Sequence, residues 1–246
     1  MKMTKKHVTA AAVLAFATAC AGAIPLPAEA MTISAGGVGL TSSDVGSTFE
    51  VDWDFANPLL TGKEVFTIKS FTSSDLKLSV DVTNTTNTGY TDRLTSWGFN
   101  TDKDITAVHN FSSTGNVFAG TSLDANLPNV SNSIEVCVFA GNNCPGGSNK
   151  GLKETKSSTV VFDLLGSFGS NPSISLDTFG LKYQSAGPNA QSYEFTGEPK
   201  CLTNCGSPKL SAVPLPGALP LFIGGLGGLG WLRFRKRRRN PAIWPE

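Results

Sequence analysis

The chain has 246 residues, with 20 Lys and Arg against 19 Asp and Glu, a formal net charge of +1. This near balance conceals an uneven distribution, because three Lys lie in residues 1–30 and six Lys and Arg lie in residues 233–246. The stretch between holds 11 basic and 17 acidic residues, a net charge of −6. Without a basic face to engage phosphates, this stretch is not expected to bind nucleic acid.

The N-terminus has the three parts of a secretory signal. Three lysines precede an apolar run over about residues 8–23, and Ala28 and Ala30 occupy the two positions that a signal peptidase reads. Residues 1–30 are therefore predicted to form a signal helix, to pass through the Sec translocon and to be cleaved after Ala30. The alternatives are an uncleaved anchor and lipidation at Cys20.

Residues 31–184 are predicted to form an all-β domain. In "STFEVDWDF" the apolar residues Phe49, Val51, Trp53 and Phe55 alternate with polar ones, which predicts a strand with one buried face. Clusters of Gly, Asn, Ser, Thr and Asp separate seven or more such runs. This pattern predicts an antiparallel β-sandwich of the jelly-roll or immunoglobulin-like type. Residues 185–212 lose the alternation, gain Pro and Gly, and are predicted to be a linker or stalk.

Four cysteines remain after the signal is removed, and export favours their oxidation. Three connectivities are possible. Because each pair is bounded by loop residues, we expect local disulfides that join Cys137 to Cys144 and Cys201 to Cys205. The alternative is a zinc site with four thiolates, but neither spacing is the two-residue gap of structural zinc sites. No metal or cofactor is expected.

Few residues suggest catalysis. His109 is the one histidine after the signal; it follows a strand pattern, and no G-x-S-x-G motif accompanies it. Asp52 and Asp54 are expected on the exposed face of a strand. Asp102 and Asp104, with Asn100, loosely resemble the start of a calcium loop, but the glycine and bidentate Glu of such a loop do not follow. We therefore expect a protein that is not an enzyme.

The C-terminal region combines a proline motif, an apolar segment and a basic block. The motif is Val213, Pro214, Leu215 and Pro216. The 16 apolar residues 217–232 would span about 24 Å as a helix, a marginal transmembrane segment. The basic block, which should stay cytoplasmic and stop transfer, consists of Arg233, Arg235, Lys236, Arg237, Arg238 and Arg239. Residues 240–246 form a short extension.

These three parts over residues 213–239 resemble the PEP-CTERM sorting signal in its Val-Pro-Leu-Pro-Ala variant, with Gly217 where the variant usually has Ala. The resemblance implies recognition by an exosortase, an integral-membrane protease of Gram-negative export systems that often accompany exopolysaccharide genes. It also implies a transient anchor in the inner membrane, followed by release to the cell surface, extracellular matrix or biofilm.

The body more faintly resembles the cistern-type exported PEP-CTERM proteins. The likeness lies in "VTNTTNTGYTDRLTSWGFN", "VCVFAGNNCPGGSNKGL" and "LDTFGLKYQSA". It supports the pairing of Cys137 with Cys144 and implies no enzymatic activity.

Three functions follow from these observations. The leading one is a non-enzymatic surface or matrix protein. One alternative is a carbohydrate-binding module for the cell's own exopolysaccharide, using aromatic faces of Trp53, Trp97, Tyr90 or Tyr183, although the strand pattern places Trp53 in the core. The other is a hydrolase.

Overall fold

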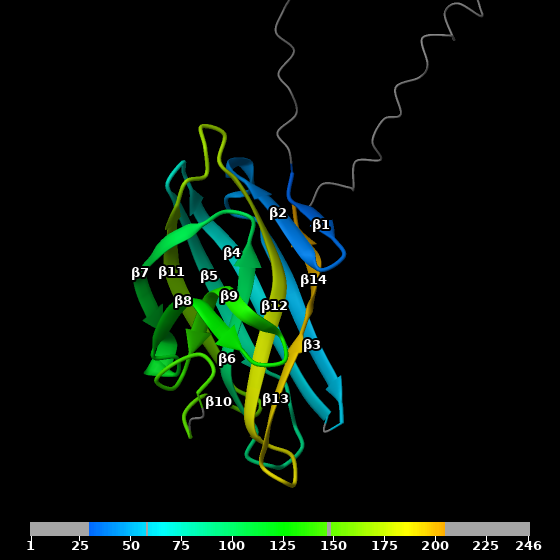
Figure 1. Ribbon diagram of the computed structural model, residues 1–246. Coiled ribbons are helices and arrows are strands. Elements are labelled where there is room, and N and C mark those ends of the chain that lie inside the picture. Colours follow the sequence, from blue (N-terminus) through cyan, green and yellow to red (C-terminus); the bar gives the residue numbers. More distant parts are fainter. Residues whose placement is uncertain (1–29, 58, 147–148, 205–246) are drawn as a thin grey trace, which may run out of the picture.

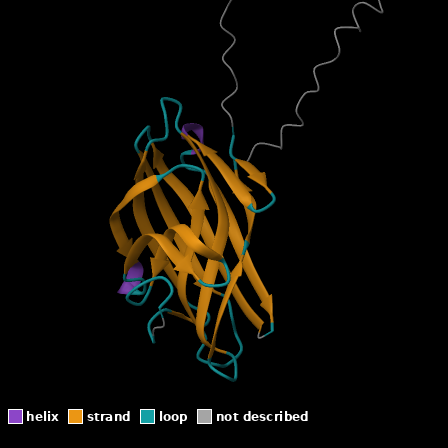
Figure 2. Cartoon of the chain, viewed as in Figure 1, coloured by secondary structure: helices purple, strands orange, loops and turns teal. Residues whose placement is uncertain are grey.

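The computed structural model describes residues 30–57, 59–146 and 149–204, which form two antiparallel β-sheets packed face to face (Figures 1 and 2). The prediction of an all-β antiparallel sandwich is confirmed. The predicted signal helix and C-terminal transmembrane helix lie outside the described residues. Among the residues that the structure describes, no helical segment has the length and apolar character of a membrane span.

The first sheet has the strand order β1-β2-β12-β6-β9-β8, with β13 also paired to β12 and β10 to β6. Its strands are β1 (Thr32–Ser34), β2 (Gly37–Thr41), β6 (Arg93–Thr101), β8 (Gly120–Leu127), β9 (Ser131–Phe139), β10 (Leu152–Lys153), β12 (Ser173–Ala186) and β13 (Gln191–Thr196).

The second sheet has the order β14-β3-β4-β5-β11-β7. Its strands are β3 (Thr48–Ala56), β4 (Leu59–Phe71), β5 (Asp75–Asn84), β7 (Ile105–Ser113), β11 (Ser157–Gly166) and β14 (Glu198–Thr203). Two short 3-10 helices, η1 (Ser42–Asp44) and η2 (Thr114–Asn116), complete the described elements.

The two-residue period of the sequence fixes which side chains face the core. On β5 the residues Leu76, Leu78, Val80 and Val82 are all buried, while the residues between them lie at the surface or partly exposed. Because alternate side chains of a strand point to opposite faces, this strand presents one apolar face to the opposing sheet. The neighbouring strands β4 and β11 pair with β5 in antiparallel register along most of its length.

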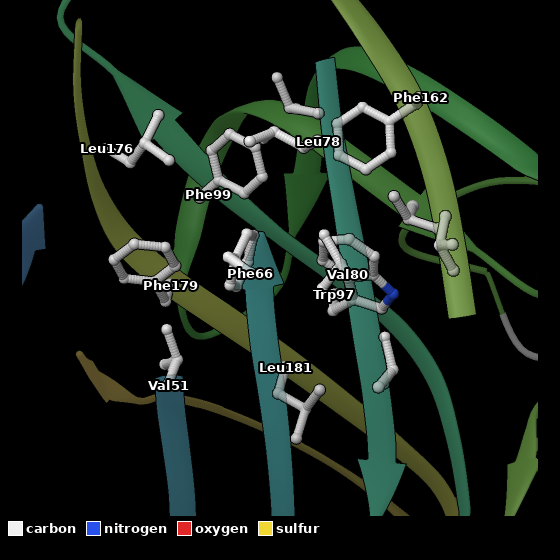
Figure 3. Close-up of a cluster of buried hydrophobic side chains, with 14 of the residues drawn as sticks. Val51, Phe66, Leu78, Val80, Trp97, Phe99, Phe162, Leu176, Phe179 and Leu181 are labelled. Carbon is white, nitrogen blue, oxygen red and sulfur yellow. The ribbon is translucent and has the colours of Figure 1, made fainter. Parts of the chain in front are cut away.

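An aromatic cluster fills the centre of the sandwich, with Phe66 of β4 in its middle (Figure 3). The Phe66 ring stacks on Phe49 at a centroid distance of 4.6 Å. It meets Trp97, Phe99 and Phe179 of the first sheet edge to face at 6.1, 5.9 and 5.8 Å. Such pairs contribute about 0.5–1.5 kcal/mol each beyond the burial of their area. The cluster thus joins the two sheets.

The predicted linker over residues 185–212 is wrong as far as residue 204. Strand β12 continues to Ala186, β13 returns beside it, and β14 crosses to pair with β3 of the second sheet. The physical reason is aromatic packing that the polar composition concealed. Tyr193 and Phe195 of β13 lie against Phe55, with ring centroids 5.4 and 5.1 Å away.

Gly197 makes the crossing between the sheets possible. Its amide donates to the carbonyl of Phe179 at 2.8 Å. A Cβ atom here would come within 2.7 Å of the Trp53 indole, so any larger residue would displace that buried ring. Trp53 itself is buried, as the strand pattern predicted, and its Nε1 also donates to Phe179 O, at 3.3 Å.

Glu64 interrupts the apolar interior. It lies on β4 between the inward-facing Gly62 and Phe66, is 1% exposed, and its Oε1 has no hydrogen-bond partner. Burial raises the pKa of this carboxyl well above its ordinary value of 4.5, since desolvation disfavours the charged form. Folding therefore favours the protonated, neutral side chain.

Replacing Glu64 with Gln should change how stability depends on pH. A carboxyl whose pKa is raised on folding stabilises the fold fully below the unfolded pKa, near 4.5, and this stability is lost as pH rises through the folded pKa. Glu64→Gln stays neutral, so its free energy of unfolding relative to the wild type should increase with pH. Urea denaturation at a series of pH values measures this difference.

The exposed Glu198 provides the control, since Glu198→Gln should shift the free energy of unfolding little and equally at each pH. A difference between Glu64→Gln and the wild type that stays constant from pH 4 to 9 would contradict a buried neutral Glu64.

The Cys137–Cys144 disulfide is confirmed, with its cysteines seven residues apart in the chain. It fixes the loop after β9 over the outer face of the first sheet, where Ser96 Oγ donates to Cys144 O at 3.0 Å and Lys182 Nζ donates to Pro145 O at 2.7 Å. Cys201 is also disulfide-bonded, and its predicted partner Cys205 lies outside the described residues. Oxidised cysteines exclude the alternative of a four-thiolate zinc site.

Removing this disulfide should destabilise the domain moderately. For so short a loop, the chain-entropy relation gives a loss of about 2–3 kcal/mol for the double substitution Cys137→Ala and Cys144→Ala, measured by urea denaturation.

Peptide mapping without reduction should also link Cys201 to Cys205. Free thiols at those two positions would show that this second local pairing is wrong.

Candidate binding pocket

A pocket of about 260 Å³ lies between the loop that joins β5 to β6 and the turn that joins β10 to β11. Strand β10, which borders the pocket, is labelled toward the lower end of the sandwich in Figure 1, whereas β1 and the end of β14 lie toward the upper end. Its lining residues are Tyr90, Thr91, Asp92, Arg93, Lys153, Glu154 and Lys156.

The buried side chain of Asn84 holds the two walls of the pocket together. Its Nδ2 donates to Leu152 O at 2.9 Å and to Asp92 O at 3.3 Å, one on each wall. Its Oδ1 accepts from Thr86 N at 3.1 Å. Asn84 fits an N-x-[ST] pattern, but a side chain with no exposed surface cannot accept a glycan.

Tyr183 completes this buried polar hub. Its phenol oxygen lies 2.9 Å from Asn84 Oδ1 and 2.8 Å from Thr61 O, and it accepts from Thr86 Oγ1 at 3.3 Å. Burial raises the pKa of Tyr183 far above its ordinary value, so the phenol keeps its proton as a hydrogen-bond donor. The hub that joins the two walls of the pocket is therefore held by neutral hydrogen bonds.

Two carboxylates share one hydroxyl at the wall of the pocket. Thr88 Oγ1 lies 2.5 Å from Asp92 Oδ2 and 2.7 Å from Glu154 Oε1. A threonine hydroxyl carries a single hydrogen, so it can donate to only one of them at a time. Asp92 Oδ1 is already satisfied by Gly187 N at 2.7 Å. Glu154 Oε2 accepts from Gly89 N at 3.3 Å. Either Asp92 Oδ2 or Glu154 Oε1 is therefore left with room for a further donor.

Three basic side chains face the same pocket. Arg93 and Lys153 are direct cross-strand partners in the β6–β10 pair, and Lys156 follows in the next turn. Within the described residues, none of the three forms an ion pair. Like charges directly opposite each other destabilise a sheet. The turn between them also places Thr155, a β-branched residue, at φ 59°, a costly conformation that is typical of functional sites.

Tyr90 is the one candidate sugar-stacking residue that is accessible. Its side chain is 48% exposed at the rim of the pocket. Trp53, Trp97 and Tyr183 are all buried in the core or the polar hub, so the expectation that they offer stacking faces is wrong. Their burial follows from the alternation of their strands, which turns each ring toward the opposing sheet.

His109 lies exposed on β7, as the strand pattern predicted. Its cross-strand partner is Asp163, which forms an ion pair with Lys77 at 3.1 Å. No hydrogen bond joins His109 to a hydroxyl or thiol of the described residues. Of the predicted carboxylate pair, Asp54 is exposed and Asp52 pairs with Lys200 of β14.

The residues that loosely resemble the start of a calcium loop form structural links. Asn100 Oδ1 accepts from Glu135 N at 3.0 Å and Asp102 Oδ1 accepts from Ser175 N at 2.6 Å, while Asp104 is exposed. These backbone amides use the oxygens that a cation would need. Across residues 30–57, 59–146 and 149–204, no group of three or more potential metal ligands is present.

Fold and pocket together define a disulfide-bonded β-sandwich with a mixed-charge pocket at one end. Comparisons with protein-family models, curated proteins and solved structures find no match to this chain.

Replacing Asn84 with Ala should destabilise the domain and separate the walls of the pocket. The change leaves buried groups such as Leu152 O and Thr86 N without a partner, at about 1–3 kcal/mol for each unsatisfied group, so a total loss of about 3 kcal/mol is expected. The exposed Asn87 in the same loop is the matched control, and Asn87→Ala should lie within about 0.5 kcal/mol of the wild type. An equal loss of stability in the two variants would show that Asn84 does not hold the walls of the pocket together.

Proposed function

We propose that this chain is an exported, non-enzymatic surface or extracellular-matrix protein of a Gram-negative bacterium, processed at its C-terminus by an exosortase. The observation that carries the proposal is the order of parts in residues 213–239: proline motif, marginal span, basic block. Chance seldom places all three together. The signal peptidase and Sec translocon would act first, and the inner membrane would hold the tail until processing.

The described domain supports export through its disulfides, and the position of its chain ends suits an anchor at the tail. Its disulfides are typical of proteins that fold outside the cytoplasm. Its first strand, β1, contacts its last, β14, so the chain enters and leaves the sandwich at one end. A tail anchored there would leave the opposite end free.

We also propose a finer class for the fold. We assign the sandwich to the jelly-roll or immunoglobulin-like group. The chain crosses repeatedly between the sheets, for example from β2 to β3 and from β5 to β6, which is typical of Greek-key sandwiches.

Two alternatives have different support. A hydrolase is poorly supported, because His109 is exposed and, among the described residues, no hydrogen bond joins it to a hydroxyl or thiol. Loss of activity on ester, glycoside or peptide substrates after a single substitution would support it. A carbohydrate-binding module is better supported, because Tyr90 lies exposed at the rim of a polar pocket.

The tail should be removed after roughly Pro216. Pro214, Pro216 and Pro220 lack the amide hydrogens that helices and sheets use, so we expect this stretch to be extended and available to a protease. Pro214→Ala with Pro216→Ala should leave the full-length chain in the inner membrane. Deleting the six basic residues should let it pass uncleaved into the periplasm. Mass spectrometry of each fraction measures these outcomes.

Pro208→Ala, a proline change upstream of the motif, is the control and should be processed like the wild type. An intact C-terminal "AIWPE" peptide in the surface fraction of cells with a working exosortase would contradict the proposal. It would show that the tail is a permanent anchor.

A further inference from the structure

We propose that the pocket between the β5–β6 loop and the β10–β11 turn binds an acidic sugar, a uronic-acid unit of a polysaccharide. The inference names a ligand class for the carbohydrate-binding alternative above, and it does not depend on processing of the tail. Three independent features of the pocket support it: unpaired cations, carboxylates with a free acceptor position, and one exposed aromatic ring.

The cations select a negatively charged ligand. Arg93 and Lys153 are cross-strand partners and repel each other, and Lys156 adds a third positive charge. The protein supplies no ion-pair partner for these three among its described residues, although the domain as a whole is acidic. A ligand carboxylate between Arg93 and Lys153 would relieve the repulsion, and Arg can hold it with two parallel hydrogen bonds.

The carboxylates select a ligand that also donates hydrogen bonds. Asp92 and Glu154 compete for the single hydrogen of Thr88, so one of them can accept from a ligand hydroxyl. Glu154 is the accessible one, since Asp92 is fully buried. A simple anion such as phosphate or sulfate would meet repulsion here, whereas a sugar acid offers a carboxylate and several hydroxyls.

Tyr90 and the size of the pocket favour a pyranose ring. The exposed phenol ring lies at the rim, where it can pack against the C–H face of a sugar. The volume of about 260 Å³ is slightly below that of most small-molecule sites, which fits one monosaccharide unit of a longer chain. A metal cation is disfavoured, since three positive side chains surround the two carboxylates.

Affinity electrophoresis of the purified full chain tests the inference. The gels contain alginate, hyaluronan or polygalacturonate as polyuronates, dextran as a neutral polysaccharide, and poly-L-glutamate as an acidic peptide. We expect retardation by at least one polyuronate and none by dextran. Lys153→Gln should weaken that binding about tenfold or more, the effect of losing one charged hydrogen bond.

Matched variants separate a built site from general charge attraction. Lys69 is an exposed lysine on β4 that forms no ion pair with another described residue. Lys69→Gln therefore makes the same charge change away from the pocket and should retain binding. Tyr90→Ala should weaken binding, and Tyr90→Phe, which keeps the ring, should restore it. Thermal melts of each variant confirm that the fold is unchanged.

Three results would overturn the inference. If the protein binds none of the polyuronates, the pocket is not a site for uronic acids. Equal weakening by Lys153→Gln and Lys69→Gln would show diffuse attraction of a polyanion. Retardation by poly-L-glutamate with the same dependence on Lys153 and Tyr90 would make the pocket a site for acidic peptides.

Discussion

The aromatic contact across the two sheets is the interaction on which the remainder of this structure depends. The Phe66 ring of the second sheet packs against Trp97, Phe99 and Phe179 of the first sheet. Side chains alternate along a strand, so a register slip of one residue would turn Phe66 outward and bring a polar neighbour inward. The cluster thus fixes the register of β4, and with it the pairing of β3 and β5 on either side.

The interior becomes polar along β4 toward the pocket. From Phe66 the inward-facing positions run through Glu64 to Gly62, where the Tyr183 hydroxyl would lie 3.4 Å from an added Cβ atom. Gly62 pairs with Asn84, the residue that joins both walls of the pocket. Each buried polar group in this hub has a partner, except Glu64, which is satisfied best when neutral. A hub of hydrogen-bonded polar groups therefore joins both walls of the pocket.

The sequence pattern predicts the fold far better than it predicts the pocket. Alternation of Phe49, Val51 and Trp53 correctly predicted a strand with one buried face, because a two-residue period has no other simple explanation. The final strands were missed, because proline, glycine and charge in residues 185–204 outweighed two aromatic residues that pack only after the chain folds back.

The local sequence pattern does not predict the pocket. Arg93 and Lys153 lie 60 positions apart in the chain, and their opposition arises only from the register of β6 with β10. Thr88 and Glu154 are similarly distant in sequence. Tyr90 was named from the sequence as one of four aromatic candidates, but only burial distinguishes it from Trp53, Trp97 and Tyr183.

The end of the last described strand and the pocket lie apart, which separates the two proposed roles physically. Thr203, near the last described residue, pairs with Thr48 at the start of β3, whereas the pocket lies beside Asn84 at the end of β5. The end of β14 and strand β10, which borders the pocket, lie toward opposite ends of the sandwich (Figure 1). Cleavage beyond residue 204 removes no residue that lines the pocket or supports its base. A chain held by its tail would therefore present the pocket away from the membrane, and the released chain would keep the same pocket.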